Sequence, residues 1–310
     1  GSVVMRHFLR DDDLTPEEFE AVLDRALELK SDPYAAKPFA GPQTVAMIFD
    51  KPTLRTQASF AVAISDLGDN PMLVDGNLAM IGVRESIADT ARVLGRMTSA
   101  IVWRTGDQAR IDEMAQCAGV PVVNALTDQF HPCQGLADLL TVREHKGALA
   151  GLTLTMVGDT ASNMGHTYLL SGALAGMHVR LSGPDGFQPL PDVFARATEI
   201  AAATGGSVTW VSDPRDAVSG ADAVATDTWV SMGKEDEAAH RLAKFHPWQL
   251  DSRLLSEAAP DAIVLHCLPA YRGKEITAEV IDGPQSVVFD EAENRLHAQK
   301  AILSMLMEWR

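Results

Sequence analysis

The stretch from Val45 to Thr56 reads Val-Ala-Met-Ile-Phe-Asp-Lys-Pro-Thr-Leu-Arg-Thr, and it decides the fold that we expect for this chain. The apolar run 45–49 is typical of a short buried strand, and the polar residues after Phe49 are typical of a turn. Apolar residues then recur at helical spacing over 57–67. The stretch therefore predicts a strand, a turn and a helix, which is the repeating unit of a parallel sheet.

The same unit recurs along the chain, so we expect an α/β protein with two similar lobes. Further strands are predicted at 71–74, 100–103, 120–124, 153–157, 178–182, 207–211, 223–227 and 262–266. Further helices are predicted at 15–30, 86–97, 109–117, 135–143, 164–175, 192–204 and 216–220. Each lobe should be a mainly parallel sheet with helices on both faces.

A domain boundary is expected at the end of the long helical stretch after residue 135. Lys146 and Gly147 end that stretch, and a Lys-Gly pair is typical of a helix stop. We therefore expect a first domain at 3–146 and a second domain at 147–291. The final stretch, about 292–310, is predicted to be a helix that returns to the first domain.

The composition excludes several classes of protein. The chain has 310 residues and a mass of 33.3 kDa, which is enough for about two domains, and its 46% hydrophobic and 22% charged residues are ordinary globular values. No apolar run approaches the roughly 18 residues that a membrane-spanning helix needs. The cysteines Cys117, Cys133 and Cys267 are too few and too scattered for a disulfide framework. We therefore expect a cytoplasmic protein.

The net charge limits the partners. It is −16, from 26 Lys and Arg against 42 Asp and Glu, so nucleic acids and anionic membranes should be repelled. An acidic chain can still bind an anion where positive side chains or a helix N-terminus concentrate opposite charge. Such a concentration should therefore be visible in the sequence if the ligand is an anion.

Polar and ionisable residues follow six of the predicted strands. In open α/β sheets ligands bind outside the carboxyl ends of the strands, so these segments are the candidate site. Each residue also has an ordinary structural explanation: an Arg can form a surface ion pair, a His can be a satisfied loop residue, and an Asp or Asn can cap a helix. Six such strand ends in one chain favour a site. The segments are 51–56, 103–105, 130–134, 158–163, 227–233 and 266–270.

The first of these segments fits a phosphate group. Its Thr53, Arg55 and Thr56 offer hydroxyls, a guanidinium and the free N–H groups of a helix start, and Arg104 supplies a second positive charge. The glycine-containing segment 158–163 lacks the G-x-G-x-x-G spacing of a dinucleotide site. The sequence therefore predicts an anion site and argues against binding of NAD.

Five segments together resemble the ornithine carbamoyltransferases in their order and spacing. The H-P-x-Q element at 131–134 is shared with the aspartate carbamoyltransferases, whereas D-x-x-x-S-M-G with H-C-L-P is typical of the ornithine branch. The resemblance covers essentially the whole chain. The segments are Asp50-Lys-Pro-Thr-Leu-Arg-Thr56, Phe130-His-Pro-Cys-Gln134, Asp227-Thr-Trp-Val-Ser-Met-Gly233, His266-Cys-Leu-Pro269 and Glu291-Ala-Glu-Asn-Arg295.

The resemblance implies that the first domain binds carbamoyl phosphate at the turn after its first strand. Donors on Arg104 and His131 would point at the carbonyl oxygen, where negative charge develops as an amine attacks. The implied carbamoyl phosphate ligands are Thr53, Leu54, Arg55, Thr56, Arg104, His131, Gln134, Cys267, Leu268 and Arg295. The implied catalytic residues are Arg104, His131, Cys267, Arg295 and Asp227.

The resemblance implies that the second domain binds L-ornithine through Asn163, Asp227, Ser231 and Met232. The neutral δ-amine would attack the carbamoyl carbon near Cys267 and give L-citrulline and phosphate. Neither a metal ion nor an organic cofactor is implied. The family also implies a homotrimer whose active sites are shared between subunits, and a role in arginine biosynthesis.

Two departures from the family pattern fall on the carbamoyl phosphate side. The turn usually reads S-T-R-T-R, but here Leu54 and Gln57 replace one hydroxyl and one guanidinium, and a lost charge-assisted hydrogen bond costs about 1.5 to 3 kcal/mol. Met80 stands where the family usually has a polar residue. The chain could therefore be a paralogue with a different amine acceptor or carbamoyl donor, or a catalytically weak relative that binds an amino acid.

Overall fold

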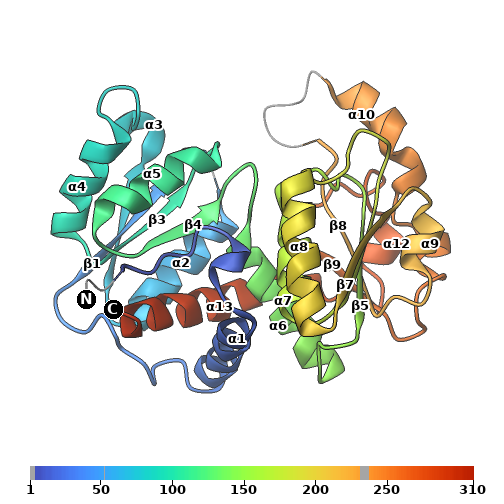
Figure 1. Ribbon diagram of the computed structural model, residues 1–310, viewed down its shortest axis with the longest axis horizontal. Helices are drawn as coiled ribbons and strands as arrows, with labels where there is room; N and C mark the ends of the chain where they lie inside the picture. Colours follow the sequence, from blue (N-terminus) through green and yellow to red (C-terminus); the bar gives the residue numbers. More distant parts are fainter. Residues whose placement is uncertain (1–3, 52, 231–236) are drawn as a thin grey trace. The chain divides into compact units, whose positions relative to one another are not determined.

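The computed structural model describes residues 4–51, 53–230 and 237–310 and divides into two compact units (Figure 1). Unit 1 contains residues 1–137 and 293–310, and unit 2 contains residues 138–292. The chain passes from one unit to the other within two helices, α6 (Pro132–Lys146) and α13 (Val288–Glu308).

Unit 1 is built on a four-stranded parallel sheet in the order β2-β1-β3-β4. The strands alternate with helices along the chain, as the sequence predicts. The elements are η1 (Asp11–Asp13), α1 (Pro16–Ser31), β1 (Thr44–Phe49), α2 (Arg55–Asp66), β2 (Asn70–Asp75), α3 (Gly76–Ala79), α4 (Ile87–Met97), β3 (Ala100–Arg104), α5 (Gln108–Ala118) and β4 (Val122–Leu126).

Both faces of this sheet are covered by helices. Ile48 of β1 and Trp103 of β3 point to one face, where they pack in a buried cluster with Ile87 of α4 and Ile111 of α5. Figure 1 shows α4 and α5 on one side of the sheet and α2 on the other. Because helices bury both faces of the central strands, β1 and β3 are apolar up to their ends, whereas the outer strand β2 is partly exposed and β4 carries the buried Asn124 at its centre.

Unit 2 is built on a five-stranded parallel sheet in the order β7-β6-β5-β8-β9. Its outer strands are β7 and β9. The elements are β5 (Thr153–Val157), α7 (Asn163–Leu174), β6 (His178–Ser182), α8 (Pro191–Thr204), β7 (Ser207–Val211), α9 (Pro214–Val218), β8 (Ala223–Thr226), α10 (Ala238–Phe245), η3 (His246–Trp248), α11 (Ser252–Leu255), β9 (Ile263–His266) and α12 (Ala278–Ile281).

Two layers of helices enclose this second sheet. Val224 and Val264 pack against Leu254 of α11 and Val280 of α12 in one buried cluster. Helix α7 contacts β5 and β6, and a Cβ atom on Gly172 of α7 would lie 2.3 Å from Cγ2 of Val179. Only glycine allows α7 to approach β6 this closely. This packing fixes the helix that begins at Asn163, directly after the site segment 158–163.

The predicted fold class is confirmed, since both sheets are parallel and alternate with helices. The predicted ends of some elements were wrong. Strand β4 begins at Val122 and not at residue 120, because Pro121 has no N–H to donate to a ladder. Helix α6 begins at Pro132, three residues earlier than predicted, since proline suits the first helical position. The helices missed by the sequence analysis are α3, α10, α11 and α12.

The described helices were also searched for a possible membrane span. Over 4–51, 53–230 and 237–310, none combines the length and the apolar character that crossing a bilayer requires.

Candidate active site

The carboxyl ends of β1 and β3 hold a polar network around Asp50. Trp103 Nε1 donates to Asp50 Oδ1 over 3.0 Å, and the Thr105 hydroxyl donates to Asp50 Oδ2. Arg110 Nη2 lies 3.6 Å from Asp50 Oδ2 and donates to the carbonyl oxygen of Ile81 over 2.9 Å. The sequence analysis did not single out Asp50 or Arg110. They tie the turn after β1 to the segment around Ile81.

Arg104 lies at an irregular point of the sheet. The register between β3 and β4 shifts between Trp103 and Arg104, so that Arg104 pairs with Leu126. Such a bulge turns the local backbone and redirects the side chain. The Arg104 carbonyl accepts a hydrogen bond of 3.0 Å from the Asp50 N–H, so the ends of β1 and β3 are held together at the candidate site.

Arg295 of α13 joins two other predicted site residues within unit 1. Its Nη2 donates to Thr56 Oγ1 over 2.9 Å, and its Nη1 donates to Gln134 Oε1 over 2.8 Å. Its Nε donates to Gln299 Oε1 over 3.1 Å. Arg295 is only 3% exposed, so these hydrogen bonds are shielded from water. Thr56 of α2 and Gln134 of α6, which lie 239 and 161 positions from Arg295 in the sequence, therefore converge on its guanidinium.

His131 immediately precedes α6 and is buried in the same unit. Burial lowers the pKa of its ring well below the ordinary value, and the positive charges of Arg295 and Arg104 lower it further. The ring is therefore neutral at physiological pH. A neutral imidazole carries one N–H donor and can polarise a carbonyl oxygen without bringing in a proton of its own.

We expect the His131 ring to stay neutral well below pH 6.5, the ordinary midpoint for histidine. The free energy of unfolding should fall as the pH drops below that midpoint, because the His131 ring then binds a proton in the unfolded chain but not in the folded one. In an Arg295→Met variant its pKa should rise, since a repelling charge has been removed. NMR titration of the ring protons measures both values. A wild-type ring titrating near 6.5 would contradict this assignment.

The segment predicted to bind phosphate, residues 53–57, lies at the start of α2, which begins at Arg55. Thr53 and Arg55 are half-buried, while the Leu54 side chain is 76% exposed. Leu54 occupies the N-cap position, and its hydrocarbon side chain cannot cap the helix. The first turn of α2 contains no acidic residue. Its N–H groups and the helix dipole are thus suited to an anion, even without the second hydroxyl of the family turn.

In unit 2, Asp227 and Cys267 follow adjacent strands and contact each other. Cys267 Sγ donates to Asp227 Oδ1 over 3.2 Å, and the Thr228 N–H donates to the same oxygen over 2.7 Å. Burial raises the pKa of Asp227 and raises that of Cys267 well above the usual range; for Cys267 the Asp227 carboxylate adds to the effect. Cys267 is therefore a thiol and not a thiolate, and so it is a weak nucleophile.

Leu268 adopts a left-handed backbone conformation, with φ at 62°. This conformation is unusual for a leucine, and here the His266 ring supports it. His266 Nδ1 accepts the Leu268 N–H over 2.9 Å, and His266 Nε2 donates to Glu275 Oε1 over 2.9 Å. The turn that carries Cys267 and Leu268 is thus fixed by the buried His266. The sequence motif includes this histidine, but no role was predicted for it.

Asp227, His266 and Cys267 place one ligand atom each within 4.8 Å of one another, the spacing of a metal site. Their hydrogen bonds do not fit that role. Both nitrogens of the His266 ring are engaged, one by the Leu268 N–H and one by Glu275. The Cys267 thiol is engaged as well, because it donates to Asp227. We therefore assign the three residues no metal.

The remaining predicted ornithine ligands lie partly outside the described residues. Asn163 is the first residue of α7, and the Ser162 hydroxyl caps this helix by accepting the Gly165 N–H over 3.2 Å. Ser231 and Met232 lie outside the described residues. Within unit 2 the structure thus brings Asp227 and Cys267 together, and it places Asn163 at a helix start.

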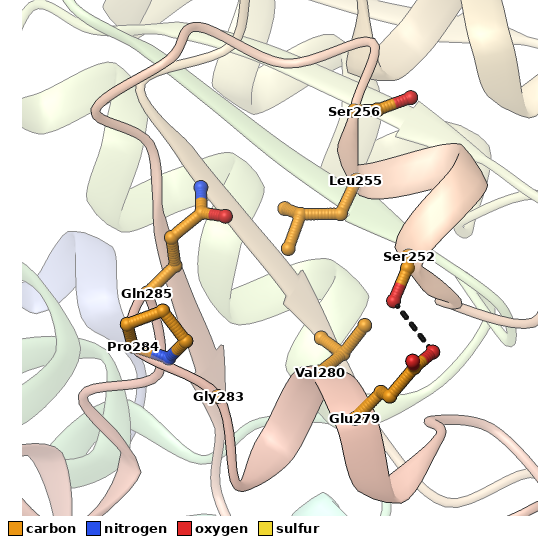
Figure 2. A pocket seen from close by; sticks show the side chains of 8 residues that line it. All are labelled: Ser252, Leu255, Ser256, Glu279, Val280, Gly283, Pro284 and Gln285. Atoms are coloured by element: carbon orange, nitrogen blue, oxygen red, sulfur yellow. Dashed lines mark hydrogen bonds between the residues drawn. The ribbon is translucent and has the colours of Figure 1, made fainter.

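A further pocket of unit 2 has no part in this arrangement. It measures about 200 Å³ and lies between α11 and α12 (Figure 2). Ser252 donates to Glu279 Oε2 over 2.9 Å at its edge. No residue of the candidate site lines it. The lining residues are Ser252, Leu255, Ser256, Glu279, Val280, Gly283, Pro284 and Gln285.

Comparison with known families matches both halves of the chain. Residues 6–144 match the carbamoyl-P binding domain of the aspartate/ornithine carbamoyltransferases, and residues 150–306 match the Asp/Orn binding domain of the same family. The chain belongs to the aspartate/ornithine carbamoyltransferase family. The resemblance that the sequence motifs indicate is thereby confirmed.

Individual carbamoyltransferases match over nearly their whole length. An ornithine carbamoyltransferase of Clavibacter sepedonicus is 59% identical over 302 residues, covering 97% of this chain and 98% of that protein. One of Renibacterium salmoninarum is 59% identical over 307 residues, covering 98% and 99%. The solved ornithine carbamoyltransferase of Pyrococcus furiosus is 41% identical with a TM-score of 0.94, covering 99% of both chains. That of Gloeobacter violaceus is 45% identical with a TM-score of 0.89, covering 99% of this chain and 100% of its own.

Proposed function

We propose that this chain transfers the carbamoyl group of carbamoyl phosphate to the δ-amine of L-ornithine, giving L-citrulline and phosphate. The observation that carries the proposal is 59% identity over nearly the full length to proteins named ornithine carbamoyltransferase. The neutral δ-nitrogen forms a bond to the carbamoyl carbon, and the bond from that carbon to the phosphate oxygen breaks. The proton lost by the amine leaves with the phosphate.

Unit 1 is assigned the carbamoyl phosphate site. The phosphate is held at the start of α2 by Thr53, Arg55 and the free N–H groups of the first turn, with Leu54 contributing its backbone N–H. The carbamoyl oxygen accepts hydrogen bonds from His131 and Arg104 as negative charge develops on it. The junction of Arg295 with Thr56 and Gln134 supports this assignment, because it holds donors and acceptors in a fixed arrangement within a buried site.

Unit 2 is assigned the ornithine site. The Asp227 carboxylate accepts hydrogen bonds from the α-ammonium group, and Asn163, Ser231 and Met232 complete the site. Cys267, kept as a neutral thiol, and the backbone at Leu268 hold the carbamoyl NH2 group. None of these residues acts as a covalent nucleophile, so the acceleration comes from orienting the two substrates and from stabilising charge in the transition state.

The altered phosphate turn gives a second candidate function some weight. Gln57 and Leu54 remove two polar groups from the family turn, and Met80, at 39% exposure, ends the short helix α3 in a left-handed conformation. A carbamoyltransferase with another amine acceptor or donor, or a catalytically weak amino-acid-binding relative, would tolerate these changes. Varying the amine with carbamoyl phosphate as the donor distinguishes another acceptor from L-ornithine.

We infer a homotrimer in which neighbouring subunits complete one another's sites. Support comes from apolar side chains exposed on β2, an outer strand of its sheet, and in the segment that follows it. Leu73, Leu78 and Val83 are 55%, 79% and 77% exposed. Sedimentation should give about three times the 33.3 kDa chain mass, and a mass near that of one chain would contradict the trimer.

We also infer a cytoplasmic enzyme whose citrulline serves arginine biosynthesis. The three cysteines are free, which fits a reducing compartment.

An acceptor panel tests the proposed substrate. Carbamoyl phosphate labelled with ¹³C is incubated with the chain and, in separate samples, with L-ornithine, L-lysine, L-aspartate or putrescine. Carbon NMR of the products should show a ureido carbon with L-ornithine at a rate at least about a hundredfold above the others, since a site built to bind polar groups rejects analogues that leave them unpaired. A faster reaction with another amine would overturn the ornithine assignment.

A further inference from the structure

Two fully buried carboxyl groups contact each other in unit 2, outside the proposed substrate sites. Asp138 lies on α6 and Glu291 on α13, the two helices in which the chain passes between the units. Both side chains are 0% exposed, and they are hydrogen-bonded to each other. Two ionised carboxylates cannot form that bond, because each can only accept. The contact itself therefore requires a proton.

The surroundings of the two carboxyl groups favour Glu291 as the group that holds this proton. The Tyr168 hydroxyl of α7 donates to Asp138 Oδ2, and the His266 N–H donates to Glu291 Oε1 over 2.8 Å. Burial raises the pKa of Glu291 well above its ordinary value, and the negative charge of Asp138 raises it further. Glu291 is thus the acid that donates, and Asp138 is the carboxylate that accepts from both Glu291 and Tyr168.

The Glu291 carboxyl group also accepts a hydrogen bond from β9, an outer strand of the second sheet. At this edge of β9, the Val264 N–H donates to the Gln285 carbonyl over 2.9 Å, and its carbonyl accepts the Val287 N–H over 3.1 Å. Two residues further along, the His266 N–H faces the same edge and donates a hydrogen bond to the Glu291 side chain. The Glu291 side chain therefore accepts the backbone hydrogen bond that a neighbouring strand would otherwise accept from His266, the last residue of β9.

This link reaches the turn after β9. The His266 backbone is held by Glu291, and the His266 ring accepts the Leu268 N–H over 2.9 Å. Cys267 lies between these two anchored residues and donates to Asp227. A shift of Glu291 would thus be transmitted directly to the turn proposed to hold the carbamoyl NH2 group.

We propose that Asp138 and Glu291 share one proton and that Glu291, in its acid form, positions the Cys267–Leu268 turn by holding the His266 backbone. The positioning part rests on the proposed function; the proton sharing does not. Loss of the proton would set two negative charges in contact and break the carboxyl–carboxyl bond. The charged or titratable groups that face the pair are Tyr168 of α7, Asp227 after β8, and His266 and Cys267 at the end of β9.

The Glu291→Gln variant tests the proton directly. The glutamine amide can donate to Asp138 and its oxygen can accept the His266 N–H, so the hydrogen bonds remain while the titratable proton is gone. Unfolding of the wild-type chain releases one proton that the variant never held. The ratio of the wild-type to the variant unfolding equilibrium constant should therefore rise with pH, by about tenfold per unit above the ordinary pKa of glutamate and below the raised pKa of Glu291.

The matched control is Glu293→Gln on the same helix. Glu293 is 60% exposed and pairs with His297 over 2.9 Å, and this contact lowers its pKa, so it is ionised both in the folded and in the unfolded chain above pH 6. The ratio of the wild-type to the Glu293→Gln unfolding equilibrium constant should therefore not change with pH over the same range. Urea unfolding at one protein concentration, repeated at each pH, gives the unfolding equilibrium constants of the wild type, Glu291→Gln and Glu293→Gln. A ratio for Glu291→Gln that stays constant with pH would overturn the shared proton.

The positioning role is tested by comparing kcat and KM. Glu291→Gln should keep kcat within about threefold of the wild type at pH 7, whereas Glu291→Leu, which cannot accept the His266 N–H, should lower kcat at least tenfold with little change in KM. A folded Glu291→Leu variant with wild-type kcat would overturn positioning, as would a loss of kcat in Glu291→Gln. If the wild-type chain forms no citrulline, the proposed function fails, while the unfolding experiment still decides on the proton.

Discussion

Replacing Arg295 with methionine is expected to lower kcat/KM for carbamoyl phosphate about a thousandfold. Arg295 holds Thr56 and Gln134 from within a buried site, and displacing preorganised groups from a transition state costs about a hundred- to a thousandfold. The change also leaves the Gln134 oxygen and the Thr56 hydroxyl without their buried partner. Both effects act on the same substrate, so the upper end of the range is expected.

Arg25→Met is the matched control for this prediction. Arg25 lies on α1, in the same unit, and pairs with Glu308 over 2.8 Å, away from the predicted site residues. Its loss removes a partly exposed ion pair worth about 0 to 1 kcal/mol and should leave kcat/KM within about twofold of the wild type. Steady-state rates at varied carbamoyl phosphate, with circular dichroism to check folding, measure both variants. Equal activity of folded Arg295→Met and wild-type protein would refute the proposed role.

Replacing Asp227 with asparagine is expected to lower kcat/KM for L-ornithine about a hundredfold and to leave the Kd of carbamoyl phosphate unchanged. The carboxylate is proposed to bind the α-ammonium group, and a hydrogen bond to a charged group contributes about 1.5 to 3 kcal/mol, or roughly ten- to a hundredfold. The same carboxylate raises the pKa of Cys267. Its removal should therefore also lower that pKa and speed alkylation of the thiol at alkaline pH.

Asp213→Asn provides the comparison within unit 2. Asp213, whose side chain is 40% exposed, caps α9, and asparagine caps helices about as well as aspartate does. Its kinetics and its rate of Cys267 alkylation, followed by mass spectrometry of the modified peptide, should match those of the wild type. If Asp227→Asn binds and uses ornithine as the wild-type chain does, Asp227 is not the ornithine ligand.

The strands were predictable because their sequence pattern reflects burial on both faces. Runs such as 45–49 and 153–157 contain no charged residue, and the structure places strands there to within a residue. The short helices α3, α11 and α12, of four residues each, were missed. A single helical turn is too short to show a periodic pattern, and such turns are stabilised mainly by their tertiary surroundings.

The candidate site was predictable where its residues follow strands. Arg104 and Asp227 lie beyond the last residues of their apolar runs, and a parallel sheet brings such ends to one edge. The same rule could have found Asp50, which directly follows β1. Asp138 and Glu291 could not have been found this way. An acidic residue within a helix normally indicates a solvated face, and only the packing of α6 and α13 shows that both are buried.

The most direct test of the central claim is the initial rate of citrulline formation by the purified chain, with carbamoyl phosphate and L-ornithine both varied. We predict saturation by both substrates and a kcat/KM for carbamoyl phosphate of at least about 10⁴ M⁻¹ s⁻¹, the lower end of the usual range for enzymes. Calorimetry of carbamoyl phosphate alone should show binding. Ornithine binding without citrulline formation, and without heat from carbamoyl phosphate, would contradict the account and favour an amino-acid-binding relative whose phosphate turn no longer functions.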